Sequence, residues 1–210
     1  MQPSQEYYDL IDSYKVLHEE EGKFKGISLA PLVPTLIHVT KENNCKTLLD
    51  YGCGKAIPYD KDRCKEVGLR NPVQELCNIE SFDLYDPAYE KYAELPDKKY
   101  DIVVCTDVLE HVPEEDLGWV ADELIDYAKK LLFLNISCIP ALKKFRDGTN
   151  VHVSLFKPEE WANFLAARLR QHRNVDLNIV LYADHKVDEE LRRRAYKITY
   201  FPTIFQLTED

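Results

Sequence analysis

The chain has 210 residues, of which 45% are hydrophobic and 30% are charged, a composition typical of one globular domain with a sizeable core. This composition excludes a fully disordered chain and a fibrous repeat. The formal net charge of −10 repels phosphate backbones, which disfavours nucleic acid as a partner without excluding a local basic contact.

The N-terminus and the cysteines indicate the compartment. No apolar run approaches the length of a membrane-spanning helix, and the first residues lack the basic start and apolar block of a signal peptide. The six cysteines are scattered without a CxxC pair, which indicates buried thiols in a reducing compartment and neither disulfides nor a zinc site. We therefore expect a cytoplasmic protein with no membrane contact.

Residues 1–44 are expected to form a helical cap in front of one globular unit at residues 45–210. Apolar side chains recur at helical spacing over residues 5–20, and residues 32–40 predict a second helix. The apolar face of the first helix contains Tyr7, Leu10, Ile11, Tyr14 and Leu17. This helix is expected either to cover a pocket as a lid or to pack on the edge of a sheet.

The remaining chain alternates between predicted strands and helices. Apolar runs predict strands at residues 46–51, 81–85, 100–105, 131–138, 178–182 and 196–201. The segments between them contain predicted helices at residues 114–130 and 158–170, a weak helix at 57–78 and a polar loop at 143–153. This alternation predicts an α/β fold with a doubly wound, mostly parallel sheet, whose last pair of strands could be antiparallel. Ligands of such sheets bind at the carboxyl ends of the strands.

The first predicted strand ends in a glycine turn that suits a nucleoside-containing ligand. Asp50 precedes Gly52 and Gly54, and glycines at a strand end let the backbone approach a ligand closely. A dinucleotide site favours a further glycine at the sixth position of the turn, where this chain has Ile57 followed by Pro58. A carboxylate just before the glycines suits the cationic amino-acid part of S-adenosylmethionine better than it suits a pyrophosphate.

Further motifs extend the pattern of this turn along the chain. The segments LLDYGCGKA at residues 48–56, YDPAY at 85–89 and YDIVVCTDVLEHVPEEDL at 100–117 resemble motifs of the class I S-adenosylmethionine-dependent methyltransferases. The segment HVSLFKPEEW at 152–161 is similar to that family's entry into the helix after its fifth strand. The resemblance covers residues 45–201, and small bacterial and phage members that share YDP and CTDVLEH are the most similar.

The resemblance implies a Rossmann-like sheet that binds S-adenosylmethionine and leaves S-adenosylhomocysteine. It implies cofactor contacts from Asp50, Tyr51, Gly52, Cys53, Gly54, Asp86, Pro87, Thr106, Asp107 and Val108. Within this set, Asp86 would hold the ribose hydroxyls. Asp86 and Asp101 are only 15 positions apart, too few for the helix and third strand that the family has there. The sheet is therefore expected to be abbreviated around its third strand, without a counterpart of the family's adenine-binding acid.

Two histidines are the candidate catalytic residues. Methyl transfer requires alignment of the acceptor and, for some acceptors, removal of a proton, and His111 and His152 are the candidate bases. Each histidine could instead stabilise a loop through a hydrogen bond. Glu110 directly precedes His111, so the two side chains are expected to face different ways on a helix. A metal bound by His111 with Glu114 or Glu115 fits helical spacing, but these glutamates suit the first turn of the next helix better, and no metal is expected.

The expected function is methyl transfer to a small-molecule acceptor. The sequence identifies neither the reacting atom of the acceptor nor the oligomeric state of the protein. The acidic surface favours a small acceptor, although Lys143, Lys144 and Arg146 form a basic loop that could contact a macromolecule. Two other functions stay open. One is a module that binds the cofactor without transferring the methyl group, and the other is an NAD-dependent oxidoreductase.

Overall fold

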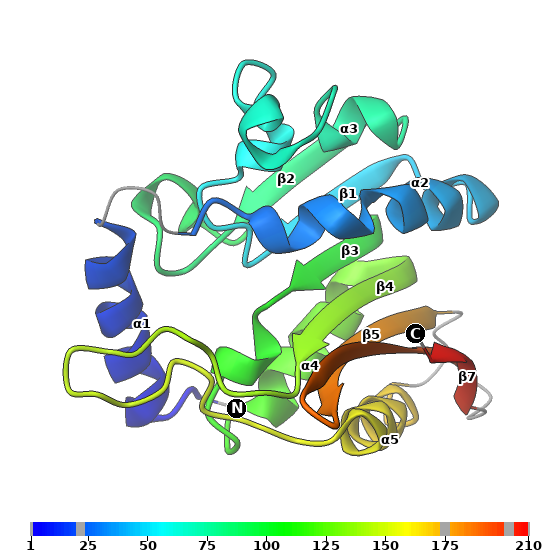
Figure 1. Cartoon of the computed structure of the whole chain (residues 1–210). Coiled ribbons are helices and arrows are strands. Elements are labelled where there is room, and N and C mark those ends of the chain that lie inside the picture. Colours follow the sequence, from blue (N-terminus) through cyan, green and yellow to red (C-terminus); the bar gives the residue numbers. More distant parts are fainter. Residues whose placement is uncertain (1, 20–23, 173–176, 200–203, 210) are drawn as a thin grey trace.

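The computed structural model describes residues 2–19, 24–172, 177–199 and 204–209 (Figure 1). These residues contain one seven-stranded sheet in the order β2-β1-β3-β4-β5-β6-β7. The strands are β1 (Thr47–Tyr51), β2 (Ser81–Tyr85), β3 (Tyr100–Thr106), β4 (Ala128–Ser137), β5 (Asn178–Val187), β6 (Glu190–Thr199) and β7 (Ile204–Glu209). The pairs from β2 to β5 are parallel, and the β5–β6 and β6–β7 pairs are antiparallel. The predicted α/β fold with a mostly parallel sheet is confirmed.

Helices cover both faces of the sheet (Figure 1). One face packs against α2 (Val33–Glu42), and the other packs against α4 (Leu117–Tyr127) and α5 (Pro158–Leu169). A further helix, α1 (Gln5–His18), stands beside the carboxyl ends of the central strands (Figure 1). The described residues also contain α3 (Val73–Leu76) and the 3-10 turns η1 (Ile27–Leu32), η2 (Ile57–Tyr59), η3 (Cys64–Val67), η4 (Glu90–Tyr92) and η5 (Leu109–His111).

The apolar sequence of β3 follows from its central place in the sheet. Ile102 and Val104 pack in the cluster on the α2 face, and Val103 and Cys105 pack in the cluster on the α4 and α5 face. Side chains alternate between the two faces of a strand, so a strand covered on both faces needs apolar residues at every position. The continuous apolar run therefore predicted this strand correctly.

The boundary between α4 and β4 differs from the sequence prediction. A helix was expected over residues 114–130, but α4 ends at Tyr127 and Ala128 already pairs with Tyr100 of β3. Alanine and lysine favour helix locally, so the segment Ala-Lys-Lys extends the helical pattern in the sequence. The pairing with β3, together with the Lys130–Asp101 ion pair at 3.2 Å, holds this segment in the sheet instead.

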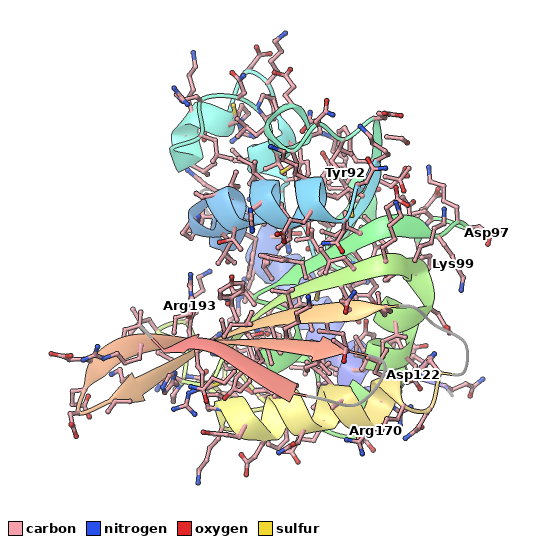
Figure 2. All side chains as sticks on the ribbon, turned by 90° about the vertical axis from the view of Figure 1, so that its right-hand side faces the viewer. Tyr92, Asp97, Lys99, Asp122, Arg170 and Arg193 are labelled. Atoms are coloured by element: carbon pink, nitrogen blue, oxygen red, sulfur yellow. The ribbon has the colours of Figure 1, made fainter. Side chains whose placement is uncertain are left out.

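The strands β5 and β6 are longer than the predictions at 178–182 and 196–201, and they form an antiparallel hairpin. Asp188 and Glu189 form its two-residue turn with φ angles of 50° and 65°, the left-handed backbone that suits the twist of a hairpin. Figure 2 shows the hairpin, with Arg193 on it, extending beyond α5. Apart from Asp188 and Glu189 in the turn, the charged residues between the two predicted strands thus belong to the strands themselves.

Several smaller expectations have mixed outcomes. The abbreviated region is confirmed, because only η4 lies between β2 and β3. The weak helix expected at 57–78 is instead two 3-10 turns and the short α3. The sequence missed β7, and the predicted residues 20, 200 and 201 lie outside the described residues. Within the described part of the chain, the helices are too short or too polar to cross a membrane.

Candidate functional site

A cavity of about 520 Å³ lies between the carboxyl ends of β1, β2 and β3 and the helix α1. Every residue that the resemblance implied for cofactor binding lines this cavity, namely Asp50, Tyr51, Gly52, Cys53, Gly54, Asp86, Pro87, Thr106, Asp107 and Val108. His111 lines it too, and the His152 ring lies behind His111, with 4.7 Å between the two ring centroids. The fold therefore brings the separate motifs of the sequence into one site.

The glycine turn after β1 depends on close packing inside the protein. Gly52 has a φ of 85°, and a Cβ there would lie 2.2 Å from Cγ2 of Val108. Gly54 has a φ of 57°, and a Cβ there would lie 2.4 Å from the carbonyl oxygen of Phe24. Both positions therefore require glycine even before a ligand approaches, because the backbone is left-handed and the space is filled.

Asp50 is a buried carboxylic acid at the end of β1. The residue lines the cavity beside the glycine turn, and only 4% of it is exposed. Burial raises the pKa of Asp50 to about 7, and the nearby Asp86 carboxylate acts in the same direction. A cationic group placed in the cavity would favour the ionised form of Asp50.

Asp86 joins the end of β2 to the glycine turn. One carboxylate oxygen accepts a hydrogen bond from the Gly54 amide at 2.9 Å, and the other accepts one from the Ala88 amide at 2.9 Å. Burial raises the pKa of Asp86, and these backbone hydrogen bonds oppose that rise. Each oxygen has a second lone pair, so the carboxylate can hold the backbone and still accept from a ligand hydroxyl.

Two histidines and two acids meet at one end of the cavity. Asp107, Glu110, His111 and His152 each place one polar side-chain atom within 4.8 Å of those of the other three. Glu110 and His111 lie in the 3-10 turn η5, and both side chains reach this cluster. The expectation that they face different ways did not anticipate this cluster, because long side chains that leave a 3-10 turn about 120° apart can still bring their polar ends together. Glu114 and Glu115, the alternative partners of His111, are exposed and lie outside the cluster.

Backbone carbonyls determine which ring nitrogen of each histidine carries the proton. The Nδ1 atom of His111 lies 2.9 Å from the carbonyl oxygen of Val151, and the Nδ1 atom of His152 lies 2.6 Å from that of Ile139. Since a carbonyl can only accept a hydrogen bond, we assign each Nδ1 as the donor and each Nε2 as the nitrogen with the lone pair. In this assignment Nδ1 of His111 also donates to the Tyr14 hydroxyl oxygen, 2.7 Å away. The hydroxyl of Tyr14 donates to the same Val151 carbonyl at 2.8 Å and holds His111 in place.

Comparison with known proteins identifies the family. Residues 27–174, more than half of the chain, match the family model of a methyltransferase domain. The chain belongs to the class I S-adenosylmethionine-dependent methyltransferases. No solved structure matches this methyltransferase significantly.

Curated relatives of this methyltransferase include several proteins named ubiquinone biosynthesis O-methyltransferase. The one from Paraburkholderia phytofirmans is 28% identical over 161 residues, which span 65% of this chain and 68% of the relative. The one from Paraburkholderia xenovorans is 26% identical over 200 residues, spanning 84% of this chain and 82% of the relative. The one from Hydrogenovibrio crunogenus is 25% identical over 191 residues, spanning 78% and 79%.

The family and the local geometry both disfavour an NAD-dependent oxidoreductase. In such enzymes a helix begins directly after the glycine turn and receives the pyrophosphate at its N-terminus. In this methyltransferase the turn continues through Ala56, whose φ is 50°, into the three-residue 3-10 turn η2 that contains Pro58. A turn of this length supplies no helix N-terminus for a pyrophosphate.

The first helix supplies a wall of the methyltransferase cavity. Lining residues on α1 are Tyr7, Leu10, Ile11, Tyr14 and His18. The sequence identified most of this apolar face but left open whether it covers a pocket or packs on the sheet edge. His18, the last residue of α1, lines the cavity as well. Its ring stacks between Phe24 and Tyr89, with centroids 4.6 and 5.3 Å away, and burial lowers its pKa to about 4.

Proposed function

We propose that this methyltransferase binds S-adenosylmethionine in the cavity and transfers its methyl group to a hydroxyl oxygen of a small-molecule acceptor. The observation that carries the proposal is that all residues expected to contact the cofactor line one cavity in a member of this family. The choice of oxygen is supported by relatives that are named O-methyltransferases.

Groups in the cavity suit two parts of the cofactor, the amino-acid part and the ribose. The buried Asp50 would attract the amino-acid part, whose ammonium group compensates the cost of ionising this carboxyl. Gly52 and Gly54 would leave their backbone open to the same part of the ligand. Asp86 would accept hydrogen bonds from the ribose hydroxyls with the lone pairs that its backbone contacts leave over.

The acceptor would lie between the cofactor and α1. Tyr7, Leu10, Ile11 and Tyr14 present mostly apolar surface to the cavity. An acceptor with an apolar or aromatic body and a hydroxyl group at one end suits such a wall, with its hydroxyl directed toward His111. The relatives' names refer to ubiquinone biosynthesis, which supports an acceptor of this general kind.

The chemistry needs alignment and one proton acceptor. The acceptor oxygen attacks the methyl carbon, the carbon–sulfur bond breaks with its electron pair left on sulfur, and the acceptor loses its proton. Alignment of oxygen, carbon and sulfur supplies much of the rate. In this proposal the proton passes to an Nε2 lone pair of His111 or His152, either directly or through water.

A calorimetric titration of S-adenosylhomocysteine into the purified protein, with NAD in a parallel run, tests the cofactor. We expect S-adenosylhomocysteine to bind and NAD not to bind. Asp86→Asn should weaken the binding. The matched variant Asp83→Asn, which alters a partly exposed acid on the same strand outside the cavity, should leave it unchanged. NAD binding in place of S-adenosylhomocysteine would overturn the proposal.

Turnover separates the enzyme from a module that only holds the cofactor. The protein is incubated with S-adenosylmethionine and a panel of phenols and aliphatic alcohols, and S-adenosylhomocysteine is measured. Formation that depends on one acceptor class supports the proposal. Tight cofactor binding without turnover on any of these acceptors would favour the binding module.

A further inference from the structure

The cluster of Asp107, Glu110, His111 and His152 has the ligand set of a metal site. Asp107 follows β3 directly, Glu110 and His111 lie in η5, and His152 comes from the loop between β4 and α5. Their side-chain polar atoms lie within 4.8 Å of one another, and Nε2 of His152 is 4.0 Å from Oδ1 of Asp107. Ligands bonded to one ion at about 2.1 Å are separated by roughly 3.4 to 4.2 Å, so a small contraction brings these atoms into coordination distance.

One side-chain oxygen of Glu110 is buried without a hydrogen-bond partner among the described residues. The residue has no exposed surface, and its Oε1 accepts the amide hydrogen of Ser137 at 2.6 Å. Among the described residues, Oε2 has no hydrogen-bond partner, although buried polar atoms normally have one. Glu110 belongs to the same cluster as the Asp107 carboxylate, so a buried acidic group lies close to a second acidic group at the cavity. A cation would relieve both the missing partner and the repulsion.

The two histidines make the hydrogen bonds that metal-binding histidines usually make. A histidine that binds a metal through one ring nitrogen commonly donates the hydrogen of the other to a backbone carbonyl or a carboxylate. Both imidazoles here donate from Nδ1 to a carbonyl, His111 to Val151 and His152 to Ile139. Tyr14 donates to the Val151 carbonyl as well and so restrains the ring of His111. The Nε2 lone pair of His152 is therefore held 4.0 Å from Oδ1 of Asp107, and a polar atom of the restrained His111 ring lies in the same cluster.

We propose that Asp107, Glu110, His111 and His152 bind one divalent transition-metal ion. Two imidazole nitrogens and two carboxylate oxygens suit Zn²⁺, Fe²⁺, Co²⁺ or Mn²⁺, whereas Mg²⁺ and Ca²⁺ prefer oxygen ligands alone. The site adjoins the cavity, which Asp107 and His111 both line. A ligand oxygen entering from the cavity can therefore occupy an open position on the ion.

The role of the ion in catalysis rests on the proposed function, but binding of the ion does not. Bound to a cation, the hydroxyl of the acceptor loses its proton more easily and presents an anionic oxygen to the methyl group. The two histidines are then ligands of the ion, and the acceptor proton leaves to water instead of to an imidazole. This assignment replaces the role of His111 and His152 as bases.

Metal titration of the full chain tests the site without any cofactor. Chelator-treated protein is titrated with Zn²⁺ by calorimetry and with Co²⁺ by visible absorption, and we expect one equivalent per chain. His152→Gln and Glu110→Gln should each weaken the affinity by about tenfold or more. His38→Gln is the matched control, because His38 also lies beside a carboxylate, Glu42 at 3.2 Å, but on an exposed helix face. Absence of saturable binding of either ion, or affinity unchanged in both site variants, would overturn the proposal.

A proton shared between Glu110 and Asp107 is the competing explanation of the cluster. Burial raises the pKa of Glu110 well above its usual range, with the Asp107 carboxylate acting in the same direction. Thermal denaturation separates the two explanations. A metal site predicts that Zn²⁺ raises the melting temperature of the wild type and not that of Glu110→Gln. A shared proton predicts that added Zn²⁺ changes neither protein.

The metal titration and the S-adenosylhomocysteine titration test separate proposals, so a negative result in one does not imply a negative result in the other. Cofactor binding without metal binding would overturn the metal site and leave the proposed methyl transfer intact. Metal binding without cofactor binding would support the site and overturn the proposed function. If metal binds, is lost in both site variants, and cofactor binds as well, the result supports the metal site and cofactor binding, with the two histidines as metal ligands and not as bases.

Discussion

At the scale of single residues, Gly52 shows how the site depends on backbone that only glycine adopts easily. Its positive φ and its contact with Val108 join the end of β1 to the segment after β3. Both segments line the cavity, so a side chain at Gly52 would displace two walls at once. The interpretation that glycine serves ligand approach was therefore incomplete, because the protein itself occupies the space of the missing Cβ.

Gly52→Ala should weaken binding of S-adenosylhomocysteine and lower the free energy of unfolding. An alanine in left-handed backbone costs about 1–2 kcal/mol, and the clash with Val108 adds to this cost. Gly68→Ala is the control, since Gly68 has a φ of 82° and nothing within 4 Å of an added Cβ. Calorimetry and urea denaturation of the two variants isolate the contact with Val108. Equal losses in both variants would show that this contact is unimportant.

Asp50 makes binding of a ligand that carries an ammonium group depend on pH. Its pKa of about 7 in the folded protein means that the carboxyl is protonated below that pH. Affinity for S-adenosylhomocysteine should therefore rise as the pH rises through 7, by up to about tenfold per unit below the pKa. Asp50→Asn should bind more weakly and without this dependence. Calorimetry from pH 5.5 to 8.5 tests it, and an identical pH dependence in the variant would contradict the role of Asp50.

The same carboxyl affects the stability of the ligand-free protein in the opposite direction. Its pKa is near 3.9 in an unfolded chain and about 7 in the folded one, so between these values the folded state binds the additional proton. The contribution of Asp50 to stability therefore falls as the pH rises from about 4 to about 7. The difference in unfolding free energy between wild type and Asp50→Asn should change with pH in this window and stay constant above it.

At the scale of secondary-structure elements, α1 is held against the cavity by a cap at its N-terminus. Ser4 accepts the amide hydrogen of Tyr7 at 3.0 Å, and its hydroxyl and amide both donate to the Asp116 carboxylate. Asp116 also accepts from Trp119 of α4 at 2.6 Å. One serine therefore starts α1 and joins it to the helix that covers the sheet.

Ser4→Ala should loosen α1 and speed the release of S-adenosylhomocysteine. Loss of an N-cap serine costs about 1 kcal/mol, and loss of the bond to Asp116 adds to this effect. Ser13→Ala provides the comparison on the same helix, because the Ser13 hydroxyl is exposed and bonds only within the helix, to the Asp9 carbonyl. Stopped-flow dissociation should be faster for Ser4→Ala alone. Equal rates for the two variants would mean that the cap does not hold the cavity wall.

At the scale of the whole molecule, two apolar layers enclose the sheet and carry most of its stability. Consecutive residues of β4 contribute to different layers, Leu131 to the α2 face and Leu132 to the α4 and α5 face. Both side chains are buried completely or nearly so. The site at the strand ends is therefore held in place from both sides.

Leu131→Ala and Leu132→Ala should each destabilise the fold by about 2–5 kcal/mol, because either change leaves a cavity in a closed layer. Leu142→Ala is the control, since Leu142 is fully exposed and should change stability by less than about 0.5 kcal/mol. Urea denaturation measures all three. If either core variant resembled the control, the corresponding face of the sheet would not be a closed layer.

The sequence alone predicted most of the strands and the residues that line the cavity. The apolar runs of the central strands, the glycine turn at Gly52 and Gly54 and the acids at strand ends are local patterns. In a parallel sheet, local patterns at the ends of neighbouring strands necessarily meet at one edge. For this reason every residue expected to contact the cofactor lines the same cavity.

Only the tertiary structure decided what depends on distant partners. Pairing with β3 places Ala128 in a strand, and the fold brings polar side-chain atoms of Glu110 and His111 into one cluster. Tyr14 reaches the Val151 carbonyl across 137 positions of sequence, and His152 joins the cluster from another loop. Periodicity describes which face of its own element a side chain occupies. It contains nothing about which distant segment that face meets, so the cluster and the role of α1 emerged only when the chain was folded.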